Sequence, residues 1–162
     1  MATTAQKLRV LAKIGGALNG AGVTWAVGAS LLLFFRGITD SFHDIDITAA
    51  KSDAKAIKEL LLPMGRLLPE KPNAKYATRH FYEFVIDGVD IDVIAGFSII
   101  SGGEEHDCSL TPAAVVSHVC VGGVTIPLQS IADWRDYYAL MGRSGRVAQI
   151  DEYLRREDGT IL

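Results

Sequence analysis

The sequence has 162 residues, of which 49% are hydrophobic and 22% are charged, and this size and composition predict one globular domain. The formal net charge is -3, so the chain as a whole produces no positive field that would attract nucleic acid. Its two cysteines, Cys108 and Cys120, lack the CxxC spacing of a zinc site and are too few for a disulfide scaffold. We therefore expect reduced thiols in a cytoplasmic protein.

An uncharged stretch extends from Ile14 to Phe35 and is long enough to cross a bilayer. Five glycines interrupt it, together with Asn19 and Thr24. These interruptions of the apolar stretch predict a helix end, a strand and a second helix packed in the core of a soluble protein. The N-terminus also lacks the pattern of a signal peptide, so we expect neither a membrane segment nor a membrane partner.

The N-terminal part of the chain predicts a helix, a strand and a second helix in turn. Apolar residues recur at helical spacing from Leu8 to Leu18, after a threonine that can cap the helix. Residues 23–27 are rich in β-branched and aromatic side chains and predict a short buried strand. After Gly28, residues 30–35 predict a short apolar helix.

Further strands are predicted where polar and apolar residues alternate. Residues 43–49 alternate in this way, and a helix that ends before Pro63 follows them. The dipeptide Asp87-Gly88 separates two alternating segments within residues 80–96, which is the strongest short-range signal of a β-hairpin. A second hairpin is predicted around a turn at Gly122-Gly123.

The chain closes with two predicted helices, the first capped by Ser130 and ended by Gly142. Together the elements predict an α+β fold, with a mixed β-sheet of four to six strands, helices packed on one side and a C-terminal helix pair. We expect a single domain over residues 1–162. Its core would occupy about residues 1–98, with the second hairpin and the C-terminal helices in about residues 99–162.

Two aspartates, Asp44 and Asp46, lie two residues apart on a predicted strand, so both carboxylates leave the same face. Their backbone positions are about 6.6 Å apart at about 3.3 Å per residue, which lets both side chains reach one Mg²⁺. Without a cation, two charges at about 4 Å repel by roughly 4 kcal/mol at an effective dielectric constant near 20. Two solvated aspartates on an exposed strand are the alternative, and for this pair alone they are the commoner case.

The first predicted hairpin supplies a second pair, Asp90 and Asp92, again on one face of a strand. Asp92 lies deeper in an apolar run, where an unpaired charge is costly. We therefore predict Asp92 as a third metal ligand, with Asp90 as the fallback. A third carboxylate completes a site for two ions about 3.5–4 Å apart.

A turn of small residues, Gly28-Ala29-Ser30, follows the first strand and opens a helix. Backbone N–H groups at a helix start, with a hydroxyl beside them, are suited to bind phosphate. In isolation the turn is more simply explained as a helix cap. Its place between a buried strand and the Asp-x-Asp strand favours the phosphate site.

This order of elements resembles the nucleotidyltransferase superfamily, whose fold DNA polymerase β shares. The resemblance covers about residues 23–97 and rests on Val27, the Gly28-Ala29-Ser30 turn and the segment Asp44-Ile45-Asp46-Ile47. It implies Mg²⁺ or Mn²⁺ ligands at Asp44, Asp46 and Asp92. It also implies contacts from the turn to the triphosphate of a nucleotide such as ATP.

The resemblance further implies a transferase that moves a nucleoside monophosphate from a nucleoside triphosphate to an acceptor hydroxyl and releases pyrophosphate. Asp44, Asp46 and Asp92 would be the catalytic residues, with Asp92 also a candidate base for the hydroxyl. The acceptor stays open among a small molecule, a protein and RNA. A homo-oligomer whose second subunit completes the cleft is a further open alternative.

The C-terminal helix pair departs from the pattern of some small members, which carry Gly-Arg followed by Lys-Asp. Arg143 matches the arginine, whereas Gly145 and Arg146 stand at the Lys-Asp positions. This departure keeps open a binding or regulatory module that has the same fold and no activity. A carboxylate-metal phosphohydrolase is a third alternative, but the histidine ligands or aspartyl nucleophile motif common in that class are not visible.

Several further polar residues are candidates for a metal site or for substrate contacts. The segment of residues 104–107 could form a second metal site, but a solvent-exposed turn is the expected structure. The loop residues Lys71, Lys75 and Arg79 could contact phosphate or acceptor, but a solvated loop is the simpler explanation. His43 could contact the nucleotide or only flank the strand, and Arg143 could face the cleft or form a surface salt bridge.

Overall fold

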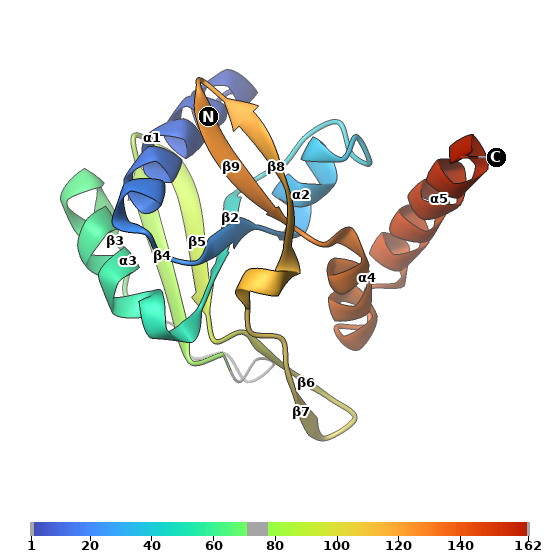
Figure 1. Ribbon diagram of the computed structural model, residues 1–162. Helices are drawn as coiled ribbons and strands as arrows, with labels where there is room; N and C mark the ends of the chain where they lie inside the picture. Colours follow the sequence, from blue (N-terminus) through green and yellow to red (C-terminus); the bar gives the residue numbers. More distant parts are fainter. Residues whose placement is uncertain (1, 71–77, 162) are drawn as a thin grey trace.

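The computed structural model describes residues 2–70 and 78–161, with side chains described as far as residue 157. Figure 1 shows the arrangement of its helices and strands. The helices are α1 (Thr4–Ala21), α2 (Ala29–Phe35), α3 (Ala54–Leu61), α4 (Ile131–Leu140) and α5 (Ser144–Ile161). The strands are β1 (Trp25–Val27), β2 (Ile45–Ala49), β3 (Arg66–Leu67), β4 (His80–Ile86), β5 (Val89–Ala95), β6 (Ser98–Ser101), β7 (Glu104–Asp107), β8 (Val115–Val121) and β9 (Val124–Gln129).

Within the described residues, seven strands form one mixed sheet in the order β3-β4-β5-β2-β1-β9-β8. The pairs β2–β5 and β1–β9 are parallel, and the other neighbours are antiparallel. The predicted α+β class with a mixed sheet is therefore confirmed. The strands that carry the predicted site residues, β2 and β5, lie side by side in the middle of the sheet.

One face of the sheet is covered by α1 and α3. Ile45 and Ile47 of β2 are fully buried, and Trp25 of β1 lies on the same face because it pairs in register with Ala49. Gly15 of α1 packs so closely here that a Cβ on it would lie 3.3 Å from the Trp25 ring. The helix α3 lies beside α1 in Figure 1.

The opposite face of the sheet receives α4. Thr48 of β2 alternates with Ile47, so its side chain leaves the other face and its hydroxyl donates to Oε1 of Gln129 at 2.9 Å. Nε1 of Trp134, on α4, donates to the same oxygen at 3.1 Å. The expected placement of helices on one side thus describes α1 and α3, whereas α4 packs on the other side through these buried polar contacts.

The first helix has the ends that its sequence predicts. Thr3 accepts a hydrogen bond from the Gln6 backbone while the Gln6 side chain accepts one from the Thr3 backbone, which is a capping box. Gly22 ends the helix with φ of 69°, a conformation that glycine adopts without steric strain. These caps fix where the chain enters β1 and so where the turn after β1 lies.

The sheet is larger than the predicted four to six strands. The additional strand β3 has two residues and pairs with the edge of β4, and it is too short to show alternation in the sequence. The segment of residues 104–107, expected as a turn, instead forms β7, which pairs with β6 as a separate hairpin. The turn of that hairpin is Gly102-Gly103, and both glycines have positive φ.

Among the described residues, no helix combines the length and the apolar character needed to cross a membrane. The glycine-interrupted stretch that raised the question forms the end of α1, β1 and α2. Leu31, Leu32 and Leu33 of α2 are fully buried in the protein core.

Candidate active site

Four aspartates form two neighbouring pairs on the face opposite α1. The strands β2 and β5 are parallel, and Asp46 is in register with Asp92. Their side chains leave the same face of two strands that lie about 4.8 Å apart. Asp44 precedes β2, and Asp90 lies two residues before Asp92 on β5, so the second pair lies one step earlier along the same two strands. The predicted residues Asp44, Asp46 and Asp92 are thus brought together, with Asp90 beside Asp44.

A fifth carboxylate, Glu83 on β4, extends the row from Asp46 and Asp92. Glu83 is in register with Asp92 on the antiparallel neighbour strand, so it points to the same face. Alternation of polar and apolar residues does not single out Glu83 as a site residue. A signal existed, because a two-residue turn at Asp87-Gly88 pairs Ile86 with Val89 and therefore places Glu83 opposite Asp92.

Three aspartates of the site, Asp44, Asp46 and Asp92, hold protons more tightly than ordinary aspartates. Burial, followed by the negative charges of Asp92 and Asp44, raises the pKa of Asp46 well above its usual range, although hydrogen bonds from Ser30 oppose the shift. Burial raises the pKa of Asp92 to about 7, with further contributions from the charges of Asp44, Glu83 and Asp90. The pKa of Asp44 is also raised, mainly by burial. The site therefore favours any positive charge placed between these groups.

The small-residue turn lies directly beside Asp46. The Gly28 N–H donates to the Asp46 carbonyl at 3.2 Å, which continues the β1–β2 pairing past Val27. The Ser30 hydroxyl donates to Oδ2 of Asp46 at 3.4 Å. Because its N–H is engaged, Gly28 does not present a free backbone donor at this turn.

The backbone of the turn shows why its residues are small. A Cβ on Gly28 would lie 2.6 Å from three atoms of the Trp134 ring, so α4 packs against the turn only because position 28 lacks a side chain. Ala29 has φ of 50°, in the left-handed region that an alanine seldom adopts. Such a conformation costs about 1–3 kcal/mol, and residues that adopt it cluster at active sites and ligand-binding loops.

A cleft of about 1100 Å³ is lined by Asp46, Asp92 and Glu83 and extends from the turn and the sheet to α4 and the start of α5. Phe81, on β4, is 42% exposed, lines the cleft and lies two residues along the strand from Glu83, in register with Ile94. The other lining residues include an apolar group and three arginines, namely Ile94, Phe97, Trp134, Tyr138, Met141, Arg79, Arg143 and Arg146. The cleft thus combines an acidic floor with apolar and basic walls.

Among the basic residues considered as candidates for contact with phosphate or acceptor, Arg79 and Arg143 line the cleft. The other two, Lys71 and Lys75, lie outside the described residues. The Arg143 guanidinium lies over the Tyr138 ring, 5.2 Å from its centroid. Arg79 lies 3.6 Å from Glu105 of β7 in an ion pair. His43 lies at the edge of the carboxylate cluster, with Nε2 3.4 Å from Oδ1 of Asp44.

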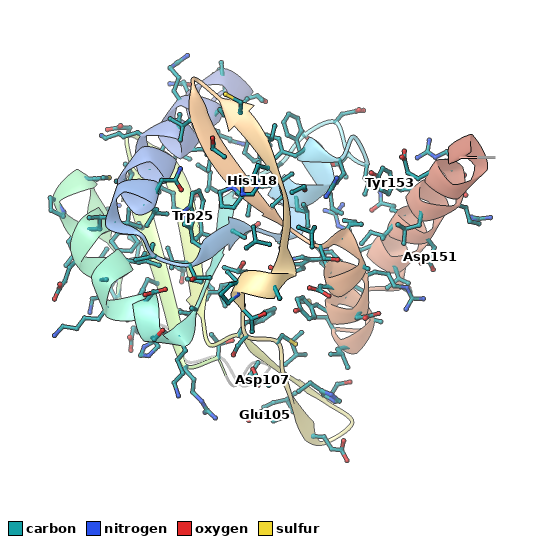
Figure 2. All side chains as sticks on the ribbon, in the orientation of Figure 1. Trp25, Glu105, Asp107, His118, Asp151 and Tyr153 are labelled. Atoms are coloured by element: carbon teal, nitrogen blue, oxygen red, sulfur yellow. The ribbon has the colours of Figure 1, made fainter. Side chains whose placement is uncertain are left out.

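The acidic segment of residues 104–107 is separate from the carboxylate cluster. Figure 2 shows Glu105 and Asp107 on the β6–β7 hairpin, which projects from the body of the protein. Oδ1 of Asp107 accepts hydrogen bonds from the hydroxyl and the backbone N–H of Ser109, and these bonds lower the pKa of Asp107. Within residues 2–70 and 78–157, this segment does not bring three metal-ligating side chains together.

Comparisons with known proteins show that the chain has the fold of nucleotidyltransferase structures. A candidate nucleotidyltransferase from Thermotoga maritima superposes with a TM-score of 0.74 at 24% identity, over 96% of each chain. The antibiotic-resistance factor ANT(2'')-Ia in solution gives a TM-score of 0.59 at 13% identity, over 98% of this chain and 96% of its own. The lincosamide antibiotic adenylyltransferase LnuA with bound lincomycin gives 0.60 at 10% identity, over 90% and 96%. No protein-family model and no curated protein sequence matches the chain.

Proposed function

We propose that this protein, which has the nucleotidyltransferase fold, transfers a nucleoside monophosphate from a nucleoside triphosphate to an acceptor hydroxyl and releases pyrophosphate. The observation that carries the proposal is the in-register pair Asp46 and Asp92, with Asp44 one step away and Ser30 in hydrogen-bond contact with Asp46. ATP is the first nucleotide to test, because LnuA is an adenylyltransferase.

The residues of the site fit Mg²⁺ or Mn²⁺. Asp44, Asp46 and Asp92 offer only carboxylate oxygens, which these hard cations prefer. All three have raised pKa values, so a bound cation would relieve a repulsion that the fold imposes. When bound, such ions neutralise the triphosphate and stabilise the charge that develops during phosphoryl transfer.

The row of side chains from Ser30 to Glu83 suggests which end of the site holds the nucleotide and which end receives the acceptor. Ala29 and Ser30, at one end, would hold the triphosphate. Asp92 lies between Asp46 and Glu83, where it would accept the proton of the acceptor hydroxyl. The acceptor would therefore enter from the side of Glu83 and Phe81.

A small hydroxylated molecule is the acceptor class that we propose first, ahead of a protein or RNA. The neighbours ANT(2'')-Ia and LnuA are an antibiotic-resistance factor and an antibiotic adenylyltransferase, and the cleft has the volume of a small-molecule site.

The proposed location is the cytoplasm, where nucleoside triphosphates are abundant. The unpaired cysteines Cys108 and Cys120 support this location.

The first experiment measures thermal unfolding with each of the four nucleoside triphosphates, with and without Mg²⁺. A ligand at a hundredfold excess over its Kd adds about 2.7 kcal/mol, which raises the Tm of a chain this size by about 5–10 °C. The double variant Asp44→Ala/Asp46→Ala should lose the shift. Asp40→Ala removes an exposed aspartate four residues upstream and should keep it.

A second assay separates transfer from binding. Release of pyrophosphate in the presence of a library of hydroxylated acceptors supports the transferase. A Mg²⁺-dependent shift in Tm without pyrophosphate from any acceptor would favour a binding module, the alternative suggested by Gly145 and Arg146 at the Lys-Asp positions. The absence of a shift with all four nucleotides would reject both.

A further inference from the structure

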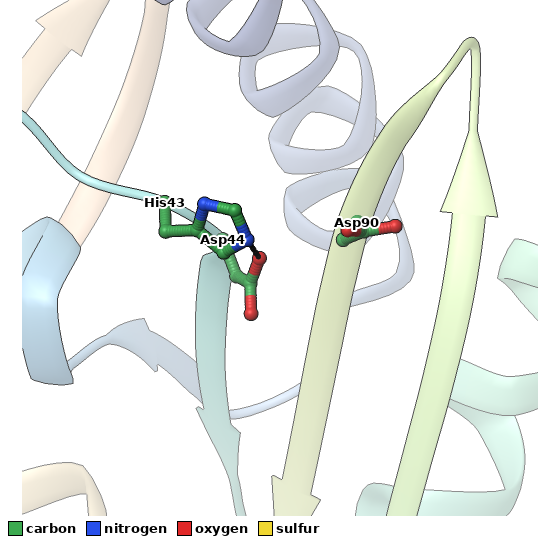
Figure 3. A group of neighbouring side chains, drawn as sticks. All are labelled: His43, Asp44 and Asp90. Atoms are coloured by element: carbon green, nitrogen blue, oxygen red, sulfur yellow. Dashed lines mark ion pairs between the residues drawn. The ribbon is translucent and has the colours of Figure 1, made fainter. Parts of the chain in front are cut away.

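A histidine and two aspartates meet at the edge of the carboxylate cluster. One ligand atom from each of His43, Asp44 and Asp90 lies within 4.8 Å of the other two. Figure 3 shows the His43 ring turned toward Asp44, with Asp90 on the adjacent strand. The group lies at the end of β2 and β5 that is farther from Phe81.

We propose that His43, Asp44 and Asp90 bind one transition-metal ion, with Zn²⁺ as the representative, beside the proposed Mg²⁺ position. An imidazole nitrogen is a good ligand for zinc and related metals, whereas Mg²⁺ is bound through oxygen. Three protein ligands leave a coordination position open to water or substrate. The inference rests on the proposed function only in sharing Asp44, and the metal can be bound without any transfer reaction.

The backbone already holds the three ligands close together. Asp44 directly precedes the pairing of Ile45 with Ile91, and Asp90 directly precedes Ile91, so the parallel register places the two aspartates side by side. Phe42, next to His43, is buried, and its carbonyl accepts a hydrogen bond from Nζ of Lys7 at 2.8 Å. The chain is therefore anchored on both sides of the histidine.

Only side-chain movement is needed to complete the site. Ligand atoms of one zinc ion lie about 3–3.5 Å from one another, given metal–ligand distances of about 2.0–2.2 Å. The His43 side chain is 76% exposed and that of Asp44 is 30% exposed, so both can rotate by the small amount required. The negative charge of Asp90 acts directly on Asp44, and a cation between them would remove this repulsion.

The test measures zinc affinity on tag-free, metal-stripped protein, by competition with a chromophoric chelator. We expect wild type to bind Zn²⁺. His43→Ala and Asp90→Asn should each weaken binding by at least about tenfold, because even loss of a side chain that only supports a metal ligand typically costs about 10–100-fold. His118→Ala removes an exposed histidine on β8 and is the matched control. Circular dichroism of each variant confirms that it is folded.

Unchanged zinc affinity in His43→Ala would overturn the proposal, as would an equal loss in His118→Ala, which would indicate adventitious binding. Asp46→Asn separates this proposal from the preceding one. The Asp46→Asn variant should lose Mg²⁺-dependent nucleotide binding. When His43→Ala is added to Asp46→Asn, zinc affinity should fall by the same factor as when His43→Ala is made in wild type. Loss of the histidine effect in the Asp46→Asn background would also count against a separate zinc position.

Discussion

Replacement of Asp92 by asparagine should stabilise the metal-free protein at pH 8. Asp92 lies between Asp46 and Glu83 in the row across three strands, and burial with the neighbouring charges raises its pKa from an ordinary value of 3.8 to about 7. The folded state therefore holds a proton that the unfolded chain has already released between about pH 4 and pH 7. Stability linked to this group is fully present below about pH 4 and is lost as the pH rises to about 7.

The magnitude follows from the width of that pH window. A difference of about three pH units corresponds to about 4 kcal/mol, at about 1.4 kcal/mol for each unit. Asp92 is half-buried rather than fully buried, and solvent screening reduces the value to about 2 kcal/mol. Asparagine has nearly the same shape and carries no charge, so Asp92→Asn should raise the free energy of unfolding by about 2 kcal/mol at pH 8 and by much less at pH 4.

Urea unfolding in the presence of EDTA, at pH 4, 6 and 8, measures this difference. Asp40→Asn removes an exposed aspartate outside the cluster and should show no comparable gain at pH 8. Addition of Mg²⁺ at pH 8 should stabilise wild type more than Asp92→Asn, because the variant lacks one proposed ligand. A stability difference that does not change with pH, or an Asp92→Asn protein that is less stable than wild type at pH 8, would refute the electrostatic reasoning.

Two further predictions concern how α4 is held against the site. Gly28→Ala should lower the free energy of unfolding by about 1–3 kcal/mol, because its Cβ would lie 2.6 Å from the Trp134 ring. Gly16→Ala, on an exposed face of α1 with no atom within 4 Å of the added Cβ, should instead stabilise by about 0.5–1 kcal/mol, and urea unfolding compares the two. Gln129→Leu should cost about 2 kcal/mol, because it leaves the indole N–H of Trp134 buried without its acceptor, and unchanged urea unfolding would contradict this.

Local signals in the sequence predict the hairpin that carries half of the site. Asp87 and Gly88 both have positive φ in the turn between β4 and β5, as a two-residue hairpin turn of this sequence requires. The alternation of polar and apolar residues on β5 correctly puts Asp90 and Asp92 on one face. The same turn also determines which residue faces Asp92. The position of Glu83 opposite Asp92 could therefore be predicted from the turn, although it could not be predicted from alternation alone.

The pairing of β2 with β5 could not be predicted in this way. These strands are parallel neighbours, yet β3 and β4 lie between them in the chain. The sequence shows that Asp46 and Asp92 each lie on the polar face of a strand, but local patterns do not say which strands become neighbours. The choice is made by long-range packing, which also places Trp134 against Gly28 and brings Gln129 to Thr48.

The strands β3 and β7 have only weak local signals in the sequence. A strand as short as β3 shows no periodicity, and it exists because its backbone pairs with β4 at Arg66 and Leu67. All four residues of β7 are polar, so this segment lacks the alternation of polar and apolar residues that predicts a strand. It is extended because its backbone pairs with β6. Pairing with a neighbour outweighs the weak β-propensity of acidic residues in such segments.

The geometry of the site is maintained by the core on the other face of the same strands. Ile45 and Ile47 on β2 alternate with Asp46, and Ile91 and Val93 on β5 are likewise fully buried. A shift of one residue in register would turn these apolar side chains to the cleft and bury the aspartates. Because the aspartates repel one another, their own contacts would drive the strands apart in the absence of a cation. The apolar face must therefore hold the register, and the carboxylates stay close enough to share a cation because the core keeps β2 and β5 paired.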